Sequence, residues 1–267
     1  MSLKLIANEV TMNIIEFKNI TVLRNKTRIL DGVDLTIVSG GNTAILGPNG
    51  SGKSTLIKLM TREIYPYNME PNTFEVFGEK VWDVLALRGK LGIVSDSMAQ
   101  LVNPDVTCFE TVVSSFYNTT NMYDMTADKK ATEKSMDSLE FMDVGHLKNR
   151  FISEVSTGEA RRVLIARALA HNPKALMLDE PTNALDIAAV HKFRATMSKI
   201  AKNGVTVIIA THTLQDVIPE IKNIVMLKEG KIFLNAVKKQ ALTKKNLEGL
   251  FGIKVELSED KGHYLMK

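Results

Sequence analysis

The segment 47–55 carries the clearest chemical signal in this chain. It reads GPNGSGKST and fits the phosphate-binding pattern G-x-x-x-x-G-K-[ST]. Residues 42–46 before it are predicted to form a short buried strand, and residues 54–62 have the apolar spacing of a helix. A strand that leads through glycines to a helix N-terminus directs backbone N–H groups and the positive end of the helix dipole at one pocket. The segment therefore predicts a site for the phosphates of a nucleotide.

The residue types in this loop suit that chemistry. Glycine lets the backbone approach a phosphate closely and adopt dihedral angles that side chains resist. Lys53 would bring a positive charge to the β- and γ-phosphates, and the hydroxyl of Ser54 would bind Mg²⁺. An ordinary strand–turn–helix junction is the alternative, but such a turn requires neither the lysine nor the hydroxyl. The predicted phosphate-loop residues are Gly47, Pro48, Asn49, Gly50, Ser51, Gly52, Lys53, Ser54 and Thr55.

Two acidic residues follow a second apolar segment, 175–178. Ligands in open α/β sheets bind outside the carboxyl ends of the strands, which is where Asp179 and Glu180 are expected. Asp179 is predicted to hold Mg²⁺ together with Ser54, and Glu180 is a candidate general base for an attacking water. The alternative is that the two acids cap a helix that begins near Pro181. Beside an intact phosphate loop, the sequence favours the metal and general-base roles.

Two further groups of polar residues fit the same chemistry. Ser156, Gly158 and Glu159 precede a helical pattern and form a hydroxyl–glycine helix N-terminus that could hold phosphate. Ser156 with Glu159 three residues later is also a capping box, which explains both residues without a ligand. The sequence leaves both interpretations open. His212 follows the predicted strand 205–210, and that position raises the odds of a functional role above those of a typical single histidine.

The elements that must position these residues alternate along most of the chain. This alternation predicts an α/β fold with a largely parallel sheet and helices on both faces. The predicted strands are 14–23, 29–38, 42–46, 73–77, 91–95, 175–178, 205–210, 224–227 and 231–234. The predicted helices are 54–62, 108–116, 127–142, 153–171 and 186–202, with another that begins near Leu214.

Three parts of the chain follow from this pattern. Residues 1–95 and 151–236 are predicted to form an α/β core. Residues 96–150 are a helical insertion, because glycine nearly vanishes there and the apolar spacing becomes helical. Residues 237–267 form a small C-terminal extension, with a helix near 243–250 and two short strands around Gly262.

Composition argues against several other classes of protein. The chain has 267 residues, of which 45% are hydrophobic and 24% are charged, as is usual for a globular protein. No apolar run approaches the ~20 residues that span a bilayer, and Asn8 and Glu9 interrupt the N-terminal segment, which lacks a secretory apolar region. The single cysteine, Cys108, cannot form an internal disulfide, which predicts a cytoplasmic protein. The net charge of +4 comes without a dense basic block, so no nucleic-acid partner is expected.

The order and spacing of these motifs over residues 14–235 resemble those of the ATP-binding-cassette (ABC) ATPases. Segment 47–55 is similar to the phosphate loop of that family, and segment 175–180 is similar to its second nucleotide motif with the catalytic glutamate. Segment 155–162 resembles the family signature, segment 183–186 the dimer-contact loop, and Thr211-His212 the switch histidine.

The resemblance implies a P-loop nucleotide-hydrolase (NTPase) core with a mostly parallel sheet, an N-terminal antiparallel β part and an inserted α-helical subdomain. It implies that ATP and Mg²⁺ are the cofactors and that two copies of the chain form an ATP-dependent dimer. The copies pair head to tail, so each ATP lies between one phosphate loop and the partner's signature, and hydrolysis depends on closure. By this resemblance the catalytic residues are Lys53, Glu180 and His212, and ATP also contacts Ser156, Gly158, Glu159 and Asp186.

Three positions depart from the family pattern. Arg24 stands where the family has an aromatic residue on adenine; its guanidinium can stack on a base, and a solvated arginine is an equally good interpretation. Asp96 replaces the glutamine that touches Mg²⁺ in relatives, and this carboxylate can bind the metal or only cap a loop with Ser97. Thr157 replaces a glycine of the signature, which places a side chain close to the nucleotide.

Residues 112–143 and the tail resemble those of ATPases from metal-chelate and molybdate-type import systems. This implies an ATPase subunit that energises transport of a metal chelate or an oxyanion across a membrane, with a polytopic membrane permease as partner. The chain would then be cytoplasmic and peripheral on the inner face of the cell membrane. Some relatives of that branch lack a known membrane partner, so a soluble regulatory ABC ATPase is the alternative function.

Overall fold

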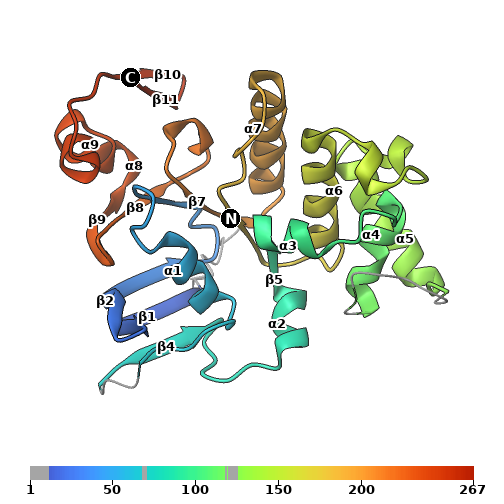
Figure 1. Cartoon of the computed structure of the whole chain (residues 1–267), viewed down its shortest axis with the longest axis horizontal. Coiled ribbons are helices and arrows are strands. Elements are labelled where there is room, and N and C mark those ends of the chain that lie inside the picture. The colour runs from blue at the N-terminus through green and yellow to red at the C-terminus, as the bar shows by residue number, and fades with distance from the viewer. Residues whose placement is uncertain (1–11, 68–70, 118, 120–125) are drawn as a thin grey trace, which may run out of the picture.

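The computed structural model describes residues 12–67, 71–117, 119 and 126–267 (Figure 1). The expectation that the chain lacks a secretory segment concerns residues 1–11, which lie outside this range. Residues 68–70 and part of the helical insertion, at 118 and 120–125, also lie outside it.

The first two strands form an antiparallel hairpin. β1 (Asn13–Arg24) pairs with β2 (Thr27–Val38) on one side and with β4 (Thr73–Val76) on the other, so this sheet has the order β2-β1-β4. The connecting residues Asn25 and Lys26 have φ values of 50° and 64°. A two-residue turn with both φ values positive matches the right-handed twist of the strands. The predicted N-terminal antiparallel part is therefore confirmed.

Six strands form a second sheet in the order β5-β6-β7-β3-β8-β9. The β8–β9 pair is antiparallel, and the other pairs of this sheet are parallel. β3 lies between β7 and β8 and all of its residues are buried, as is usual for a central parallel strand. The carboxyl ends of the parallel strands meet at one edge of the sheet. The strands are β3 (Thr43–Leu46), β5 (Leu91–Val94), β6 (Ala175–Asp179), β7 (Thr206–Thr211), β8 (Asn223–Lys228) and β9 (Lys231–Val237).

Helices connect these strands. α1 (Lys53–Met60) follows the phosphate loop, and α7 (Ile187–Lys202) connects β6 to β7. The sequence pattern did not predict α2 (Val84–Lys90) and α3 (Asp96–Leu101), which Asp83 and Ser95 cap with their side chains. The remaining α-helices are α4 (Cys108–Val113), α5 (Lys129–Phe141), α6 (Thr157–Leu169), α8 (Lys238–Ala241) and α9 (Lys244–Phe251). Among the described residues, no helix is both long and apolar enough to cross a membrane.

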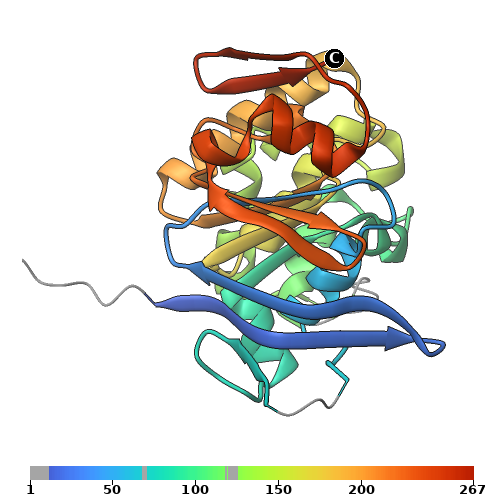
Figure 2. The ribbon, with the colours of Figure 1, turned by 90° about the vertical axis from the view of Figure 1, so that its left-hand side faces the viewer.

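Two apolar clusters lie on opposite faces of the six-stranded sheet. In β6, Leu176 and Leu178 belong to the cluster that contains residues of α4, α6 and α7. Ala175 and Met177 belong to the other cluster, which contains residues of α1 and of the β2-β1-β4 sheet. Figures 1 and 2 both show β1 and β2 in the lower half of the molecule. Helices therefore pack on both faces as predicted, and the antiparallel sheet shares one face with α1.

The helical insertion and the C-terminal part lie at different sides of the core. α4 and α5 pack against α6 at the right of Figure 1. α8, α9 and the hairpin of β10 (Leu257–Asp260) and β11 (His263–Met266) lie at the top left, and Figure 2 shows them above β1 and β2. The predicted helix and two strands of the tail are present. The division of the chain after residues 95, 150 and 236 stays a prediction.

Three predicted helices differ from the observed ones. The helix expected near Leu214 is a single 3₁₀ turn, η4 (Leu214–Asp216), and Pro219 follows it, which disfavours a helical conformation at the residue before the proline. The helix expected over 153–171 begins only at Thr157, after the 3₁₀ turn η3 (Ile152–Glu154). The segment 108–116 divides into α4 and the 3₁₀ turn η1 (Ser114–Tyr117).

Candidate functional site

The phosphate loop leaves the carboxyl end of β3 and enters α1. The backbone of Gly47 is so tightly packed that a Cβ atom there would lie 2.3 Å from the carbonyl oxygen of Leu227. Gly52 has a φ of 105°, which side chains rarely adopt, and occupies the N-cap position of α1. No side chain caps this helix N-terminus. The loop therefore presents backbone N–H groups at an uncapped helix end, where anions bind.

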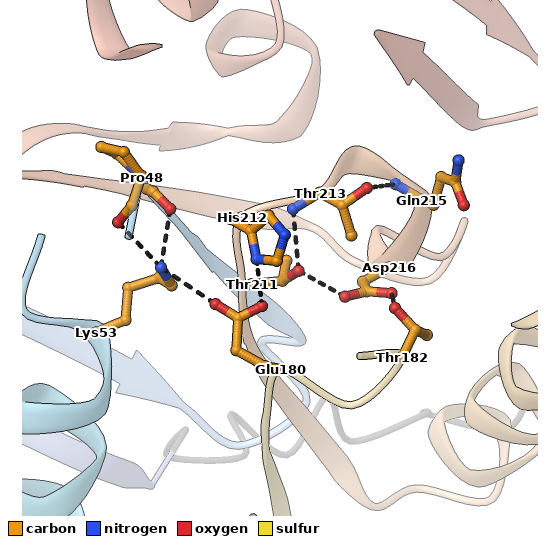
Figure 3. A network of polar contacts seen from close by, with 10 residues as sticks. Pro48, Lys53, Glu180, Thr182, Thr211, His212, Thr213, Gln215 and Asp216 are labelled. Atoms are coloured by element: carbon orange, nitrogen blue, oxygen red, sulfur yellow. Dashed lines mark hydrogen bonds and ion pairs between the residues drawn. The ribbon is translucent and has the colours of Figure 1, made fainter. Parts of the chain in front are cut away.

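Lys53 has its ammonium group inside this loop. The side chain is 5% exposed, and Nζ donates hydrogen bonds to the carbonyl oxygens of Gly47 (2.9 Å) and Pro48 (3.1 Å). The same Nζ lies 3.2 Å from Oε1 of Glu180, a residue that follows β6 (Figure 3). Lys53 is thus a nearly buried positive charge that two carbonyl oxygens solvate and one carboxylate neutralises.

Glu180 occupies a strained turn at the end of β6. Its φ is 47°, a conformation that costs a non-glycine residue about 1–3 kcal/mol. Its backbone N–H donates to the carbonyl oxygen of Ala210 in β7 (2.9 Å). Residues 181–184 form a turn, and the next helix, α7, begins at Ile187 with Asp186 as its N-cap. The alternative that Asp179 and Glu180 cap a helix near Pro181 is therefore wrong.

His212 follows the carboxyl end of β7 and contacts the same glutamate. Its Nδ1 lies 2.6 Å from Oε2 of Glu180, and its side chain is 45% exposed. β3, β6 and β7 are neighbours in the sheet, so the segments that follow them lie side by side. The structure therefore brings together Lys53, Glu180 and His212, which the sequence had assigned to one site.

A second carboxylate, Asp216, lies behind this group, and none of the sequence motifs included it. Its oxygens accept hydrogen bonds from Oγ1 of Thr182 (2.6 Å) and Oγ1 of Thr211 (2.5 Å). Burial raises the pKa of the Asp216 carboxyl, and the two threonine hydrogen bonds oppose that rise. In the sequence Asp216 is a single acid between Gln215 and Val217 and belongs to no motif, so only the fold could identify it.

Ser156 is the N-cap of α6, and the capping box is formed. Oγ of Ser156 accepts a hydrogen bond from the backbone N–H of Glu159 (3.4 Å), whose Oε2 accepts one from the N–H of Ser156 (2.9 Å). The hydroxyl of Ser156 also donates to Oε2 of Glu159 (2.7 Å), and this bond holds the pKa of Glu159 below its ordinary value. The capping interpretation is confirmed, and it leaves a phosphate role possible because the helix N-terminus is exposed.

A cavity of about 450 Å³ opens beside this helix N-terminus. It lies between the first turns of α6 and α7, where the Asp186 side chain accepts a hydrogen bond from the backbone N–H of Ala189 (2.7 Å). A Cβ atom on Gly158 would lie 3.1 Å from Cβ of Ala189, which is a tight contact, so the glycine leaves more room at this opening. The residues that line the cavity include Ser156, Thr157, Gly158, Glu159, Arg162, Asp186 and Lys192.

The structure does not join this cavity to the phosphate loop of the same chain. Among the described residues, no hydrogen bond or ion pair links Ser156, Gly158, Glu159 or Asp186 to residues 47–55. The predicted ATP-binding residues therefore form two groups within one copy of the chain.

Two other predicted site residues, Arg24 and Asp96, lie at the end of strand β1 and shortly after strand β5. Arg24 is exposed at the end of β1, where it pairs with Thr27, and Gly52 packs against the nearby residues Ile29 and Leu30 of β2. Asp96 is the first residue of α3, which begins shortly after β5 ends, but its side chain lies outside the described part of the structure. The N-cap of that helix is Ser95, whose Oγ accepts a hydrogen bond from the backbone N–H of Met98 (3.3 Å).

The donors predicted for Mg²⁺ suit that ion. Ser54 lies in the first turn of α1, and Asp179 is the last residue of β6, two strands from β3. Within the described residues, no three His, Cys, Asp or Glu side chains gather as a metal site. Mg²⁺ binds to one or two protein oxygens and takes its other ligands from water and phosphate, so a hydroxyl and a carboxylate fit it.

Comparison with known proteins agrees with the motifs. The family model described as "ABC transporter" matches residues 30–183. An uncharacterised ABC transporter ATP-binding protein, YmeB, from Lactococcus lactis is 31% identical over 96% of this chain and 98% of its own length. The hemin import ATP-binding protein HmuV of Photobacterium damselae is 32% identical over 88% of each chain.

A solved structure gives the same result for the fold. The dimeric structure of MJ0796, a bacterial ABC transporter cassette, superposes with a TM-score of 0.69 at 26% identity, and covers 84% of this chain and 98% of that one. The family model, the relatives that match over nearly their whole length and the shared fold all indicate the same family as the phosphate loop and the adjacent Glu180. This chain therefore belongs to the ABC transporter family and is an ATP-binding ATPase of that family.

Proposed function

We propose that this chain hydrolyses ATP at a head-to-tail interface between two copies of itself and so energises transport of a metal chelate or an oxyanion across a membrane. The observation that carries the proposal is the position of the Glu180 carboxylate, which lies 3.2 Å from Nζ of Lys53 and 2.6 Å from Nδ1 of His212. A carboxylate held between a phosphate-binding lysine and a histidine suits activation of a water next to a γ-phosphate.

Each side chain has a separate task in this proposal. Lys53 exchanges its contacts with Gly47, Pro48 and Glu180 for the β- and γ-phosphate oxygens of ATP. Glu180 accepts the proton of the attacking water, and His212 holds the glutamate in place. Mg²⁺, bound by Ser54 and Asp179, neutralises charge on the phosphates when it is present.

The second copy supplies the other half of the site. The cavity beside Ser156 and Gly158 is exposed at the N-terminus of α6, and it contributes nothing to the phosphate loop of its own chain. A helix N-terminus of this kind can bind the γ-phosphate of an ATP molecule that the phosphate loop of the partner chain holds. The dimeric relative MJ0796 supports this arrangement.

The transport role and its cargo are inferred from relatives. HmuV is named as a hemin import protein, which supports a metal chelate as the cargo and a polytopic permease as the membrane partner. In this role the chain is cytoplasmic and peripheral on the inner face of the membrane.

Arg24 and Asp96 complete the proposed nucleotide site. Arg24 stacks on the adenine ring, which its exposed position at the end of β1, near the residues that pack on Gly52, allows. Asp96 contributes a further oxygen near Mg²⁺, since β5 and β6 are neighbours and Asp96 follows β5.

Two substitutions test the catalytic part. Lys53→Ala should abolish measurable hydrolysis, and Glu180→Gln should lower kcat by about 10²–10⁴-fold, as for loss of a general base. Lys58→Ala is the matched control, because Lys58 is an exposed lysine of the same helix. ATPase activity at saturating MgATP is the measurement. Wild-type turnover in either Lys53→Ala or Glu180→Gln contradicts the proposal.

Two further measurements test the dimer and the transport role. With MgATP, Glu180→Gln should elute as a dimer from a sizing column, and Glu180→Gln with Ser156→Arg should elute as a monomer. ATPase activity should rise when the chain is reconstituted with a permease encoded beside its gene and a loaded binding protein. If Glu180→Gln stays monomeric with MgATP, the proposal of an ATP site shared between two copies is contradicted. If no permease gene lies beside the gene of this chain, the soluble regulatory role is favoured.

A further inference from the structure

Asp216 is a buried carboxylate in an unusual place. It is 1% exposed and ends the 3₁₀ turn η4, four residues after His212. Taking a carboxylate out of water is unfavourable unless hydrogen bonds compensate for it. Both compensating bonds come from threonine hydroxyls, Oγ1 of Thr182 at 2.6 Å and Oγ1 of Thr211 at 2.5 Å. Each carboxylate oxygen therefore has a hydroxyl partner, and neither is left unpaired in the interior.

The two threonines belong to the two segments that carry the catalytic pair. Thr182 lies in the turn after β6, two residues beyond Glu180. Thr211 is the last residue of β7 and directly precedes His212. Asp216 therefore ties the backbone of Glu180 to the backbone of His212, as Figure 3 shows.

Both segments need such support. Glu180 has a positive φ of 47°, and such a conformation persists only where the surroundings impose it. His212 is 45% exposed and its side chain contacts Glu180, so the backbone around His212 must set its position. The hydroxyl of Thr211 also accepts a hydrogen bond from the backbone N–H of Thr213 (3.1 Å), which fixes the chain on the other side of His212.

We propose that Asp216 is a positioning residue for ATP hydrolysis, which holds Glu180 and His212 in register through Thr182 and Thr211. The proposal rests on the catalytic role proposed for Glu180. Asp216 touches neither the phosphate loop nor the cavity of α6, so it acts on the rate of the chemical step and not on ATP binding. A displacement of about 1 Å at a catalytic group costs up to ~10²-fold in rate.

Steady-state ATPase kinetics of Asp216→Ala test this role. The expected result is a kcat lower by about 10–100-fold with KM for ATP within about twofold of the wild type. Asp216→Asn keeps one oxygen acceptor and should recover part of the lost kcat. Thr182→Val and Thr211→Val each remove one of the two hydroxyl donors and should each lower kcat by a part of the same amount.

Glu220→Ala is the matched control. Glu220 lies four residues after Asp216 and is a half-buried carboxylate, but it accepts a hydrogen bond from Ser198 (2.6 Å) and pairs with Lys202 (3.2 Å). This variant should keep kcat within about twofold. If Asp216→Ala does not fold, as judged by thermal melting, the Asp216→Asn and two valine variants decide the question. Wild-type kcat in all the variants that fold overturns the proposal.

A double-mutant cycle shows whether Asp216 acts through Glu180. Adding Asp216→Ala to Glu180→Gln should lower kcat no further, because the group that Asp216 positions has already lost its function. If the factors by which the two single substitutions lower kcat multiply in the double variant, the positioning role is overturned. If Glu180→Gln alone is inactive while Asp216→Ala keeps full kcat, only this inference fails. If Glu180→Gln alone retains wild-type kcat, the proposed function fails first.

Discussion

Oε2 of Glu180 lies 2.6 Å from Nδ1 of His212, although 32 positions separate the two residues in the chain. Parallel pairing of β6 with β7 brings them together, because each residue directly follows the carboxyl end of its strand. The other carboxylate oxygen of Glu180 faces Lys53, so the glutamate is held from two sides.

His212→Ala removes one of these two contacts. We expect kcat to fall by about 10–100-fold, because a misoriented base is less effective, while the affinity for ATP changes little. The control is His191→Ala, which replaces an exposed histidine of α7. Equal kcat values for His212→Ala and the wild type would show that the contact with Glu180 has no role in hydrolysis.

Glu180→Gln should bind ATP more tightly than the wild type. The neutral amide no longer competes with phosphate for Lys53, and it removes a negative charge near the nucleotide. Charge interactions at a partly exposed site are worth about 0.2–1 kcal/mol, which corresponds to roughly a 1.4-fold to fivefold gain in affinity. Equilibrium titration with a fluorescent ATP analogue at low and high salt measures this, and the gain should shrink at high salt. Weaker binding by Glu180→Gln contradicts this account.

Gly47→Ala tests the packing of the phosphate loop. Its Cβ atom would lie 2.3 Å from the carbonyl oxygen of Leu227 and 2.6 Å from Oγ of Ser51, so the loop must move. We expect a loss of about 1–3 kcal/mol in the free energy of unfolding, together with loss of ATP binding. In the control Gly89→Ala the new Cβ meets no atom within 4 Å, and the helical position gains about 0.5–1 kcal/mol. Urea unfolding of both variants gives the comparison, and an equally stable Gly47→Ala refutes the packing argument.

Acid should destabilise the chain partly through His171. Burial lowers the pKa of His171 below its ordinary value of 6.5, and its ring stacks on Phe116 with centroids 4.3 Å apart. The unfolded chain then binds the proton more readily, so the stability present above pH 6.5 is lost as the pH falls towards the folded-state pKa. His171→Phe keeps a ring without the titration, and its melting temperature should fall less between pH 7 and pH 5 than that of the wild type. Identical slopes would assign the acid sensitivity to other groups.

Cys108 should resist thiol reagents in the native state. The side chain is fully buried, and burial raises the pKa of its thiol to about 11. At pH 8 the reactive thiolate is then on the order of one part in a thousand. An aromatic disulfide reagent should modify the chain quickly in guanidinium and only very slowly in buffer. Rapid native modification would show that α4 opens readily from the core.

The sequence alone determined the phosphate loop, the two acids after 175–178 and the α/β class. These features depend on short-range relationships, such as glycine spacing before a helix or apolar periodicity within a strand, which residues close together in the chain carry. The capping box of Ser156 with Glu159 is predictable for the same reason. The family resemblance then added the roles of His212 and of the signature.

Only the tertiary structure decided which of these groups meet. The contact of Glu180 with His212 and the bridge from Thr182 to Asp216 join segments 32 and 34 positions apart, and the strand order β6-β7-β3 creates both contacts. The 3₁₀ turn η4 is another example, because the sequence predicts a helix there, whereas the observed turn ends at the buried residue Asp216. No local pattern marks Asp216, because its role depends on two threonines whose proximity exists only after the sheet has formed.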